Sequence, residues 1–429
     1  MKCNKIVGSF LAVTMITGLI TGCGSKAEKT IADTATVQTE TDETENGETT
    51  NTEPVQLVVW HDNDETMMNA LGEALNQSLA AENITVSFEK KSDVTSQIKL
   101  YGTDSQNGPD MYLFAHDSLG NFAEMGILEP VGNLISADQE TELLPMTINA
   151  ASYKNEQYLM PVYYETLLFM YNKALWKGEI PITTDELYDY MVKNTDINAG
   201  TYALVNQHSG AYNVAPVING FGGYIINDKA EPGLNQQATK DAIEYNKKFA
   251  ELEADGDYNT VTTLFNEQKA AAIIGGPWLV SGIKDAGIDL GIKSLASMKL
   301  PNGNSLKPYS GVQCIGVLKY AAESKKEAVK KVLEELTKPE IGIMLAKDFN
   351  CAPANAKAYE DQAISSNEMI QAMKETAEIA EPMPNIPQMG VMWGPTESLL
   401  AAVNKSNEDI DKAADQYQEE ALTAIKDMQ

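Results

Sequence analysis

The stretch that most constrains this chain is 107–126, which reads as a turn, a short strand, a polar loop and the start of a helix. The Asn-Gly-Pro sequence at 107–109 is a strong turn signal, and the apolar run 111–115 has the length of one buried strand. Polar residues 116–118 come directly after this run. Because ligands bind outside the carboxyl ends of strands in an open α/β sheet, this loop is predicted to lie at a binding site.

The side chains of this stretch suit a polyol with one apolar face. Phe114 offers a ring, Asp117 a carboxylate and Ser118 a hydroxyl. The local alternative is that His116 and Asp117 only cap the helix that begins near Leu119, because short polar side chains are common at helix starts. Local sequence leaves both roles open.

The residues before this stretch set the fold class. Residues 55–60 have a strand pattern, apolar residues recur at helical spacing over 67–79, and 84–88 alternate as a second strand. Such alternation of strands and helices predicts a doubly wound α/β sheet. Asp62 and Asp64 resemble the start of a calcium loop, but the glycine and the distal glutamate of such a loop are missing, so no metal is predicted.

Length and charge limit the possible functions. A chain of 429 residues is long enough for two domains. It carries 32 basic and 61 acidic residues, which gives a net charge of −29. Nucleic acid is not expected as a partner, because phosphate recognition needs clustered Lys and Arg. No cofactor is expected either.

Residues 1–22 are interpreted as a lipoprotein signal peptide. A basic start is followed by the apolar run 6–20, which is shorter than the roughly 20 residues that a membrane-spanning helix needs. Cys23 ends an Ile-Thr-Gly-Cys sequence that resembles a lipobox. Acylation of Cys23 would anchor the chain to the extracellular face of the cell membrane, with 23–53 as a disordered acidic tether. The alternative is an ordinary secretory signal with an incidental cysteine.

Two further cysteines and two capping patterns lie in the last third of the chain. Cys314 and Cys351 allow one disulfide in an exported protein, or two buried thiols that act as small apolar groups. Capping-box patterns at 324–327 and 337–340 predict two helix starts, and Pro339 suits a first helical turn. These features predict packing and no chemistry.

Four blocks follow one another in a fixed order. They are the stretch 107–126, PVYYETLLFMYNKAL from Pro161, AAIIGGPW from Ala271 and MPNIPQMGVMW from Met383. In this order they resemble the maltose- and maltodextrin-binding proteins, the extracellular solute-binding subunits of sugar ABC importers. The resemblance implies an α/β fold of the two-lobed periplasmic-binding-protein type, with doubly wound sheets, a hinge of three chain crossings and a ligand in the cleft between the lobes.

The resemblance also implies a domain plan and a function. The amino-terminal lobe would comprise residues 54–163 and 312–356, and the carboxyl-terminal lobe residues 164–311 and 357–429. The chain would be a monomeric receptor, not an enzyme, that captures maltooligosaccharides (α-1,4-glucans) and delivers them to ABC permease subunits in the membrane. Its lipid anchor would hold it at that membrane.

The expected contact residues combine rings, which cover the faces of a sugar, with carboxylates, which accept hydrogen bonds from its hydroxyls. They are Asp62, Asp64, Glu65, Phe114, Asp117, Ser118, Glu165, Tyr212, Tyr258, Trp278, Met383 and Trp393. A carboxylate at the first crossing would face the cleft. The Gly-Gly-Pro sequence at 275–277 is expected to form a turn from which the Trp278 indole projects.

Several positions depart from the best-known members of the resembled family. Phe114 stands where Trp is usual, Ser118 where Arg is usual, Glu65 where Lys is common, and Glu397 where Arg can stand. Gly-Ala-Tyr-Asn at 210–213 replaces Glu-Pro-Tyr-Phe. Chain length or linkage preference can therefore differ, with α-1,4-glucans the best single expectation. The alternatives are another oligosaccharide, a polyol or a polyamine, and a glycoside hydrolase, for which no proton donor can be identified.

Overall fold

The computed structural model describes residues 53–252 and 256–428. The predicted signal peptide, the predicted lipidation site Cys23 and nearly all of the predicted tether lie outside the described residues. No helix in the described ranges combines the length and the apolar character that a membrane crossing requires.

The first sheet is built on the three strands that the amino-terminal patterns predict. β1 (Val55–His61) pairs in parallel with β2 (Ile84–Lys90) on one side and β3 (Met111–Ala115) on the other. α1 (Glu65–Ser78) and α2 (Val94–Tyr101) connect these strands. The apolar residues of α1 are buried at helical spacing, so the helix packs on the sheet through one face. The predicted alternation of strands and helices is confirmed.

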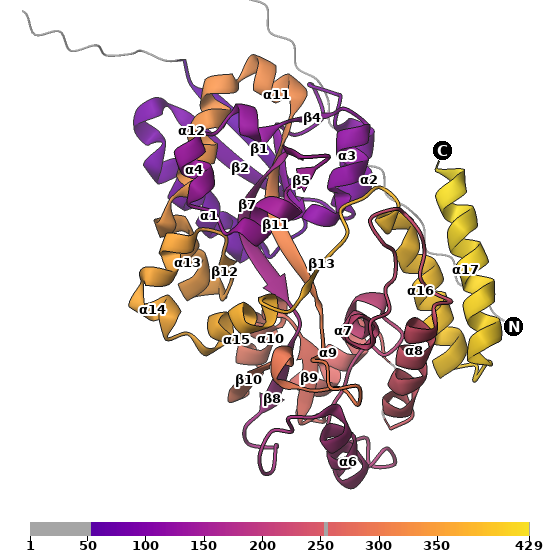
Figure 1. Cartoon of the computed structure of the whole chain (residues 1–429). Helices are drawn as coiled ribbons and strands as arrows, with labels where there is room; N and C mark the ends of the chain where they lie inside the picture. Colours follow the sequence, from indigo (N-terminus) through magenta and orange to yellow (C-terminus); the bar gives the residue numbers. More distant parts are fainter. Residues whose placement is uncertain (1–52, 253–255, 429) are drawn as a thin grey trace, which may run out of the picture. The chain divides into compact units, whose positions relative to one another are not determined.

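Two long antiparallel strands complete the first sheet. β7 (Leu159–Thr166) and β11 (Tyr309–Leu318) lie side by side, and the strand order is β12-β7-β11-β3-β1-β2. β12 (Ala352–Pro353) forms one edge, while β13 (Glu381–Pro382) and β4 (Leu128–Glu129) pair with the two ends of β11. Figure 1 shows β11 extending out of this sheet towards the strands of the second one.

The second sheet is short and antiparallel, with β8 at its centre. Its order is β10-β8-β9, where β8 is Leu168–Asn172, β9 is Ala272–Gly275 and β10 is Leu290–Ser294. Helices α7 (Ala211–Phe221), α8 (Gln237–Ala250), α16 (Met389–Asn404) and α17 (Ile410–Asp427) pack on one another beside it. α15 (Glu368–Ala377) packs against β10.

The remaining elements are short or peripheral. Their bounds are α3 Leu119–Glu124, α4 Ala137–Thr141, α5 Pro145–Ala150, β5 Ser152–Tyr153, β6 Glu156–Gln157, α6 Thr184–Asn194, α9 Tyr258–Asn266, α10 Val280–Asp285, α11 Lys319–Ser324, α12 Lys326–Thr337, α13 Pro339–Phe349 and α14 Gln362–Ser365. Short 3₁₀ turns occupy η1 Ala80–Glu82, η2 His116–Ser118, η3 Val131–Asn133, η4 Pro277–Leu279, η5 Leu295–Ser297 and η6 Ala356–Glu360.

The chain passes between the two sheets three times, as the resemblance implied. Only Leu167 separates β7 in the first sheet from β8 in the second. The second passage joins β10 to β11, and the third leads from β12 to α15. This arrangement is the two-lobed α/β architecture with a three-crossing hinge. The lobe boundaries stay a prediction, although β7 continues in the first sheet as far as Thr166.

Both predicted capping boxes are wrong, although the two helices that they predicted, α12 and α13, are present. Ser324 ends α11 and its hydroxyl donates to the Tyr320 carbonyl, so it does not cap α12. Thr337 ends α12 and donates to the Glu334 carbonyl. Pro339 does stand in the first turn of α13. In both cases the hydroxyl prefers a carbonyl of the preceding helical turn over the next helix.

The two cysteines of the described region are free and buried. Cys314 lies within β11, and the Cys351 sulfur lies 3.5 Å from the Met67 sulfur. Of the two alternatives left open by the sequence, the structure supports buried thiols that act as small apolar groups.

Candidate functional site

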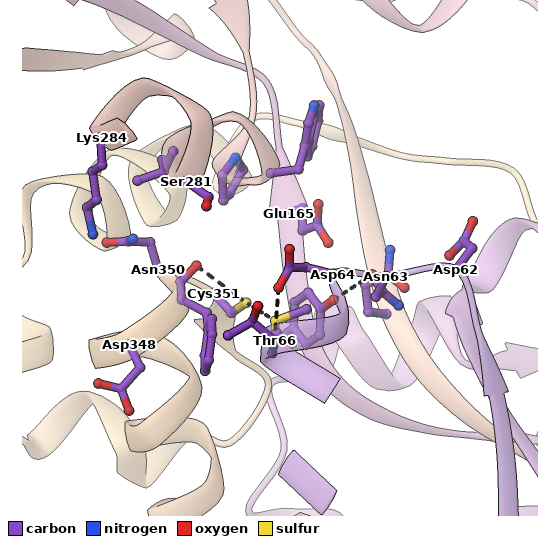
Figure 2. Close-up of a pocket in the computed structure, with 17 residues that line it drawn as sticks. Asp62, Asn63, Asp64, Thr66, Glu165, Ser281, Lys284, Asp348, Asn350 and Cys351 are labelled. Carbon is purple, nitrogen blue, oxygen red and sulfur yellow. Dashed lines mark hydrogen bonds between the residues drawn. The ribbon is translucent and has the colours of Figure 1, made fainter. Parts of the chain in front are cut away.

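Two cavities meet where the ends of the first-sheet strands face the second lobe. The larger cavity, of about 510 Å³, is drawn in Figure 2. The smaller one is about 340 Å³. Glu165, Trp278 and Gln313 line both cavities, so the two form one continuous cleft. Clefts of this size with a few placed polar groups are typical of small-ligand sites.

The floor of the cleft is a row of three neighbouring residues on three strands. Gln313 of β11 pairs with Tyr163 of β7 on one side and with Ala115 of β3 on the other. Residues that pair directly across antiparallel strands project on the same face of the sheet. Tyr163 accordingly lines the larger cavity, Ala115 the smaller one and Gln313 both.

An irregularity in the β7–β11 ladder lies next to this row. The pairing register shifts between Gln313 and Cys314, where β7 contains one extra residue, Val162. Bulges of this kind re-aim side chains and are common beside binding sites. Here Gln313 and Glu165 line the cleft from adjacent strands, on the side of the shift where the pairing is regular.

The loop after β1 supplies one polar side of the larger cavity, with Asp62, Asn63 and Asp64 in sequence (Figure 2). Asp64 is the N-cap of α1, because one of its carboxylate oxygens accepts from the Met67 amide at 3.0 Å. The hydroxyl of Tyr163 donates to the side-chain oxygen of Asn63 at 3.1 Å. The amide nitrogen of Asn63 is buried and has no hydrogen-bond partner in the described chain.

Asp117 lines the smaller cavity, and its Oδ1 atom is buried without a hydrogen-bond partner among the described residues. Neither η2 nor α3 begins with a side-chain capping bond. His116 therefore does not cap the helix, because its ring bonds to Val312 and Met383, and Asp117 does not only cap it, because it also lines the smaller cavity. Asp117 stands in the 3₁₀ turn at the end of β3, and its carboxylate also accepts from the backbone amides of Asp117 and Ser118.

His116 is fully buried behind Asp117 and ties three segments together. Its Nδ1 accepts from the Val312 amide at 3.1 Å, so Nε2 carries the proton and donates to the Met383 carbonyl at 2.9 Å. Burial lowers the pKa of His116 to about 4, which keeps the ring neutral. The imidazole thus fixes the segment that brings Met383 to the smaller cavity.

Three acids of the cleft have raised pKa values. Burial, reinforced by the charge of Asp62, raises the pKa of Asp117 to about 7 and that of Glu165 to about 7. Burial also raises the pKa of Asp62. Lys284 is the one cation that lines the cleft within the described ranges, and it lies on the other side of the larger cavity from Asp62 (Figure 2). The nearby charge of Lys90 partly opposes the rise in the pKa of Asp62.

The opposite wall is aromatic and comes from the second lobe. Trp278 in η4 lines both cavities and keeps 40% of its surface exposed. Its ring lies directly over Gly276, where a Cβ atom would come within 2.1 Å of the indole. The turn before Trp278 therefore needs glycine at 276, because only glycine leaves room for the indole in this position.

Two more rings, those of Tyr212 and Trp393, continue the wall from Trp278, and the buried ring of Tyr309 packs between them. Tyr212 at the start of α7 lies 6.3 Å from Trp278, and Tyr309 lies 6.5 Å from Tyr212, both measured between ring centroids. Trp393 of α16 meets Tyr309 edge-on at 6.4 Å. Tyr212, Trp278 and Trp393 line the smaller cavity together with Met383. Such rigid rings offer large apolar faces to a ligand.

Four of the predicted contact residues do not line either cavity. Glu65 is exposed in the first turn of α1, and Phe114 packs against the core of the sheet. The Ser118 hydroxyl is buried and lies 3.1 Å from that of Thr95. Tyr258 is 45% exposed at the start of α9. Contacts of these four residues with a ligand stay predictions without geometric support.

Sequence reasoning missed several residues that line the cleft, chiefly Asn63, Gln313 and Lys284. Asn63 stands between Asp62 and Asp64, which were predicted to contact the ligand, and this position was the only sequence signal for Asn63. Gln313 is the single amide in the apolar run 312–318. A polar residue inside a buried-strand pattern is itself a signal, because burying an unpaired amide is costly.

The arrangement suits a neutral polyhydroxylated ligand. Its acids and amides can exchange hydrogen bonds with hydroxyls, and its rings can cover C–H faces. Within the described residues, no group of three or more His, Cys, Asp or Glu side chains could hold a metal ion. The cleft offers binding groups, and none of its parts requires a cofactor.

The comparisons with known proteins agree with this geometry. Residues 70–372 match the family described as bacterial extracellular solute-binding protein. A maltotriose-binding protein of Pyrococcus abyssi is 32% identical, over 86% of this chain and 82% of that protein. A galactooligosaccharide-binding protein of Bacillus subtilis is 29% identical, over 86% of this chain and 90% of that protein.

A solved structure shares the fold. A cyclo/maltodextrin-binding protein, crystallised with maltotetraose, superposes with a TM-score of 0.75 and 24% sequence identity, covering 88% of this chain and 98% of that chain. At this identity the likeness establishes the fold, which is the two-lobed α/β architecture described above.

Proposed function

The chain belongs to the bacterial extracellular solute-binding proteins, and from that premise we propose that its cleft binds maltooligosaccharides for an ABC importer. Members of this family are binding proteins and not enzymes, so the hydrolase alternative is set aside. The sugar would be held between the aromatic wall of the second lobe and the polar floor of the first.

One observation carries the proposal. Three residues that line the same cleft as Trp278 each have a buried hydrogen-bonding atom without a partner in the described part of the chain, namely Asp117 Oδ1, Asn63 Nδ2 and Gln313 Oε1. Buried polar atoms are nearly always paired in folded proteins, so a cluster of unpaired ones facing a cavity indicates a ligand that pairs them. A pyranose supplies hydroxyls around its rim and apolar C–H faces above and below.

The identity of the sugar rests on the relatives. Two of the named proteins bind α-linked glucans, maltotriose and maltotetraose, and one binds galactooligosaccharides. The wall of several rings favours an oligosaccharide over a single sugar, because successive units can each lie against a ring. α-1,4-Glucans are the proposed ligands, and β-linked galactooligosaccharides are the second candidate.

Capture would be followed by delivery at the membrane. Closure of the two lobes around the sugar would be a hinge motion at the three crossings. A ligand that contacts both lobes favours the closed state through its higher affinity for that state. The lipobox-like sequence at Cys23 supports a lipid anchor at the extracellular face of the cell membrane, beside the permease that receives the sugar.

The test is calorimetric titration of the mature chain, residues 23–429, with maltose, maltotriose, maltotetraose and a cyclodextrin. β-1,4-Galactotetraose and spermidine serve as alternatives. Saturable heat with the α-linked series supports the proposal, and the trend with length reports how many sugar units the cleft holds. Heat with the galactoside or spermidine alone would overturn the ligand assignment and leave the fold intact.

A further inference from the structure

The floor of the cleft contains two amide side chains, Asn63 and Gln313, each held by a neighbour and each left with one free atom. Both line the larger cavity. Neither was expected to bind a ligand from sequence patterns, and neither is charged. Their hydrogen bonds define which atom of each amide is left unpaired among the described residues.

Asn63 presents a donor. Its side-chain oxygen accepts from the Tyr163 hydroxyl at 3.1 Å, while its Nδ2 is buried and unpaired within the described chain. A carboxamide has one acceptor oxygen and one donor nitrogen, so engagement of the oxygen fixes which end remains available. Tyr163 is itself fully buried, which holds this arrangement in place.

Gln313 presents an acceptor. Its side chain hydrogen-bonds to the Glu165 carboxyl group, and because Gln313 Oε1 has no partner among the described residues, the Gln313 nitrogen is the donor in that bond. Its Oε1 is buried and has no partner among the described residues. The register shift beside Gln313 and the small Ala115 on the neighbouring strand leave this amide facing the junction of the two cavities.

We propose that Asn63 and Gln313 form a specificity-determining pair that reads two hydroxyls of one bound sugar, one as an acceptor and the other as a donor. The inference rests on the proposed function and names two side chains that recognise the hydroxyls of the sugar. An alkyl or halogen substituent in place of either hydroxyl would leave a buried amide atom unpaired, which is how a site built to bind hydroxyls rejects close analogues.

Isothermal titration of the mature chain with maltotetraose tests the pair, using Gln313→Leu and Asn63→Ala. β-1,4-Galactotetraose replaces maltotetraose if the wild type binds that sugar instead. Each substitution is expected to weaken binding by about 5- to 30-fold, the usual effect of losing one buried hydrogen bond. Gln313→Met serves as a second apolar variant if Gln313→Leu does not fold.

Gln157→Leu is the matched control. Gln157 also has a buried Oε1 that finds no partner in the described ranges, and its nitrogen donates to the Leu159 carbonyl at 3.0 Å. Gln157 lines neither cavity of the cleft. Its substitution is expected to leave the sugar affinity within twofold of the wild type. Equal losses of sugar affinity in Gln157→Leu and Gln313→Leu would overturn the inference, because both losses would then come from a general destabilisation of the sheet.

A ligand-side measurement makes the assignment specific. The ligands are maltotriose analogues that each lack one hydroxyl. For the wild type, one of these analogues should bind at least fivefold more weakly than maltotriose. For Gln313→Leu, the same analogue and maltotriose should bind with equal affinity. A different analogue should behave in this way with Asn63→Ala. Unchanged affinity in both variants, with normal binding by the wild type, overturns the inference alone. Absence of any sugar binding by the wild type overturns the proposed function together with it.

Discussion

The two sides of the cleft are built in different ways. The floor comes from β3, β7 and β11 of the first sheet and from the loop after β1. It carries acids and amides, of which Asp62 and Asp64 are exposed, whereas Asn63, Asp117, Glu165 and Gln313 are half-buried. The wall comes from η4, α7 and α16 of the second lobe, and it carries rings. Trp278 keeps 40% of its surface exposed, whereas the floor atom Asp117 Oδ1 is buried.

This difference separates two sources of binding free energy. The wall has apolar area that water still contacts, so a sugar that covers it gains free energy in proportion to the area removed from water. The floor holds polar groups whose cost of burial is already present in the free protein, visible in the raised pKa values of Asp117 and Glu165. The wall should therefore provide affinity, and the floor selectivity and pH dependence.

The largest expected effect comes from the wall. Trp278→Ala should weaken maltotetraose binding by about 2–4 kcal/mol, roughly 30- to 1,000-fold, because an indole covers about 150–250 Å². Titration calorimetry measures the loss, and thermal unfolding should change little because the indole is half exposed. Trp278→Phe should retain most of the affinity. If Trp278→Ala lost tenfold less maltotetraose affinity than Asp117→Asn, the floor and not the wall would be the main source of affinity.

Asp117→Asn should act on affinity and stability in opposite directions. The pKa of Asp117 in the folded protein, about 7, lies above its usual value of 3.8, so the folded state binds more protons between about pH 4 and 7. Stability of the wild type therefore falls as pH rises through this interval. The variant, which cannot ionise, should be more stable than the wild type by about 1–4 kcal/mol at pH 8 and equally stable at pH 4.

The same variant should bind maltotetraose about 10-fold more weakly at pH 8, since a carboxylate accepts a stronger hydrogen bond than an amide oxygen does. Denaturant unfolding at pH 4, 6 and 8, with titration calorimetry at pH 6 and 8, checks both effects. The wild-type affinity should rise from pH 6 to 8 as Asp117 and Glu165 ionise. A stability difference that does not change with pH would contradict the raised pKa of Asp117.

A smaller effect on affinity is expected from substitution of His116, which is buried behind the floor of the cleft. His116→Phe keeps a ring but leaves the Val312 amide and the Met383 carbonyl unpaired, which should destabilise the protein by about 2–4 kcal/mol. Affinity should fall by about 3- to 10-fold, because the segment that carries Met383 loses its attachment. Urea unfolding and calorimetry separate the two. Lower stability with unchanged affinity would limit His116 to a structural role.

The smallest effects are expected at residues that sequence patterns selected but the cleft does not contain. Tyr258→Ala and Glu65→Ala should each change the maltotetraose affinity by less than about twofold, since neither side chain lines a cavity and exposed substitutions are usually close to neutral. A tenfold loss in Tyr258→Ala would extend the aromatic wall as far as α9.

Local patterns predicted the parts of the fold that depend on neighbours in sequence. The strand at 111–115 and the polar residues after it were identified from a turn signal and an apolar run, and β3 has those bounds. The position of Trp278 followed from the glycines before it. Met383 and Trp393, in contrast, were predicted only from the family resemblance.

The floor was only partly accessible, because it depends on strand pairing. Asp117 could be predicted as a strand-end carboxylate, and Glu165 from the chain crossing that the family resemblance implied. The row of Tyr163, Gln313 and Ala115, in contrast, joins residues of three strands and lies beside a register shift at Val162. No local pattern contains that information. The capping boxes failed for a related reason, since Ser324 and Thr337 bond to preceding carbonyls that compete equally well.

The most direct test of this division is a crystal structure of the mature chain with maltotetraose. We expect the sugar faces to lie on Trp278 and Trp393, with one hydroxyl within about 3 Å of Asp117 Oδ1 and others bonded to Asn63 and Gln313. A sugar that lies on the rings of the second lobe alone, with Asp117 Oδ1 still unpaired, would contradict the account that the two lobes share one ligand.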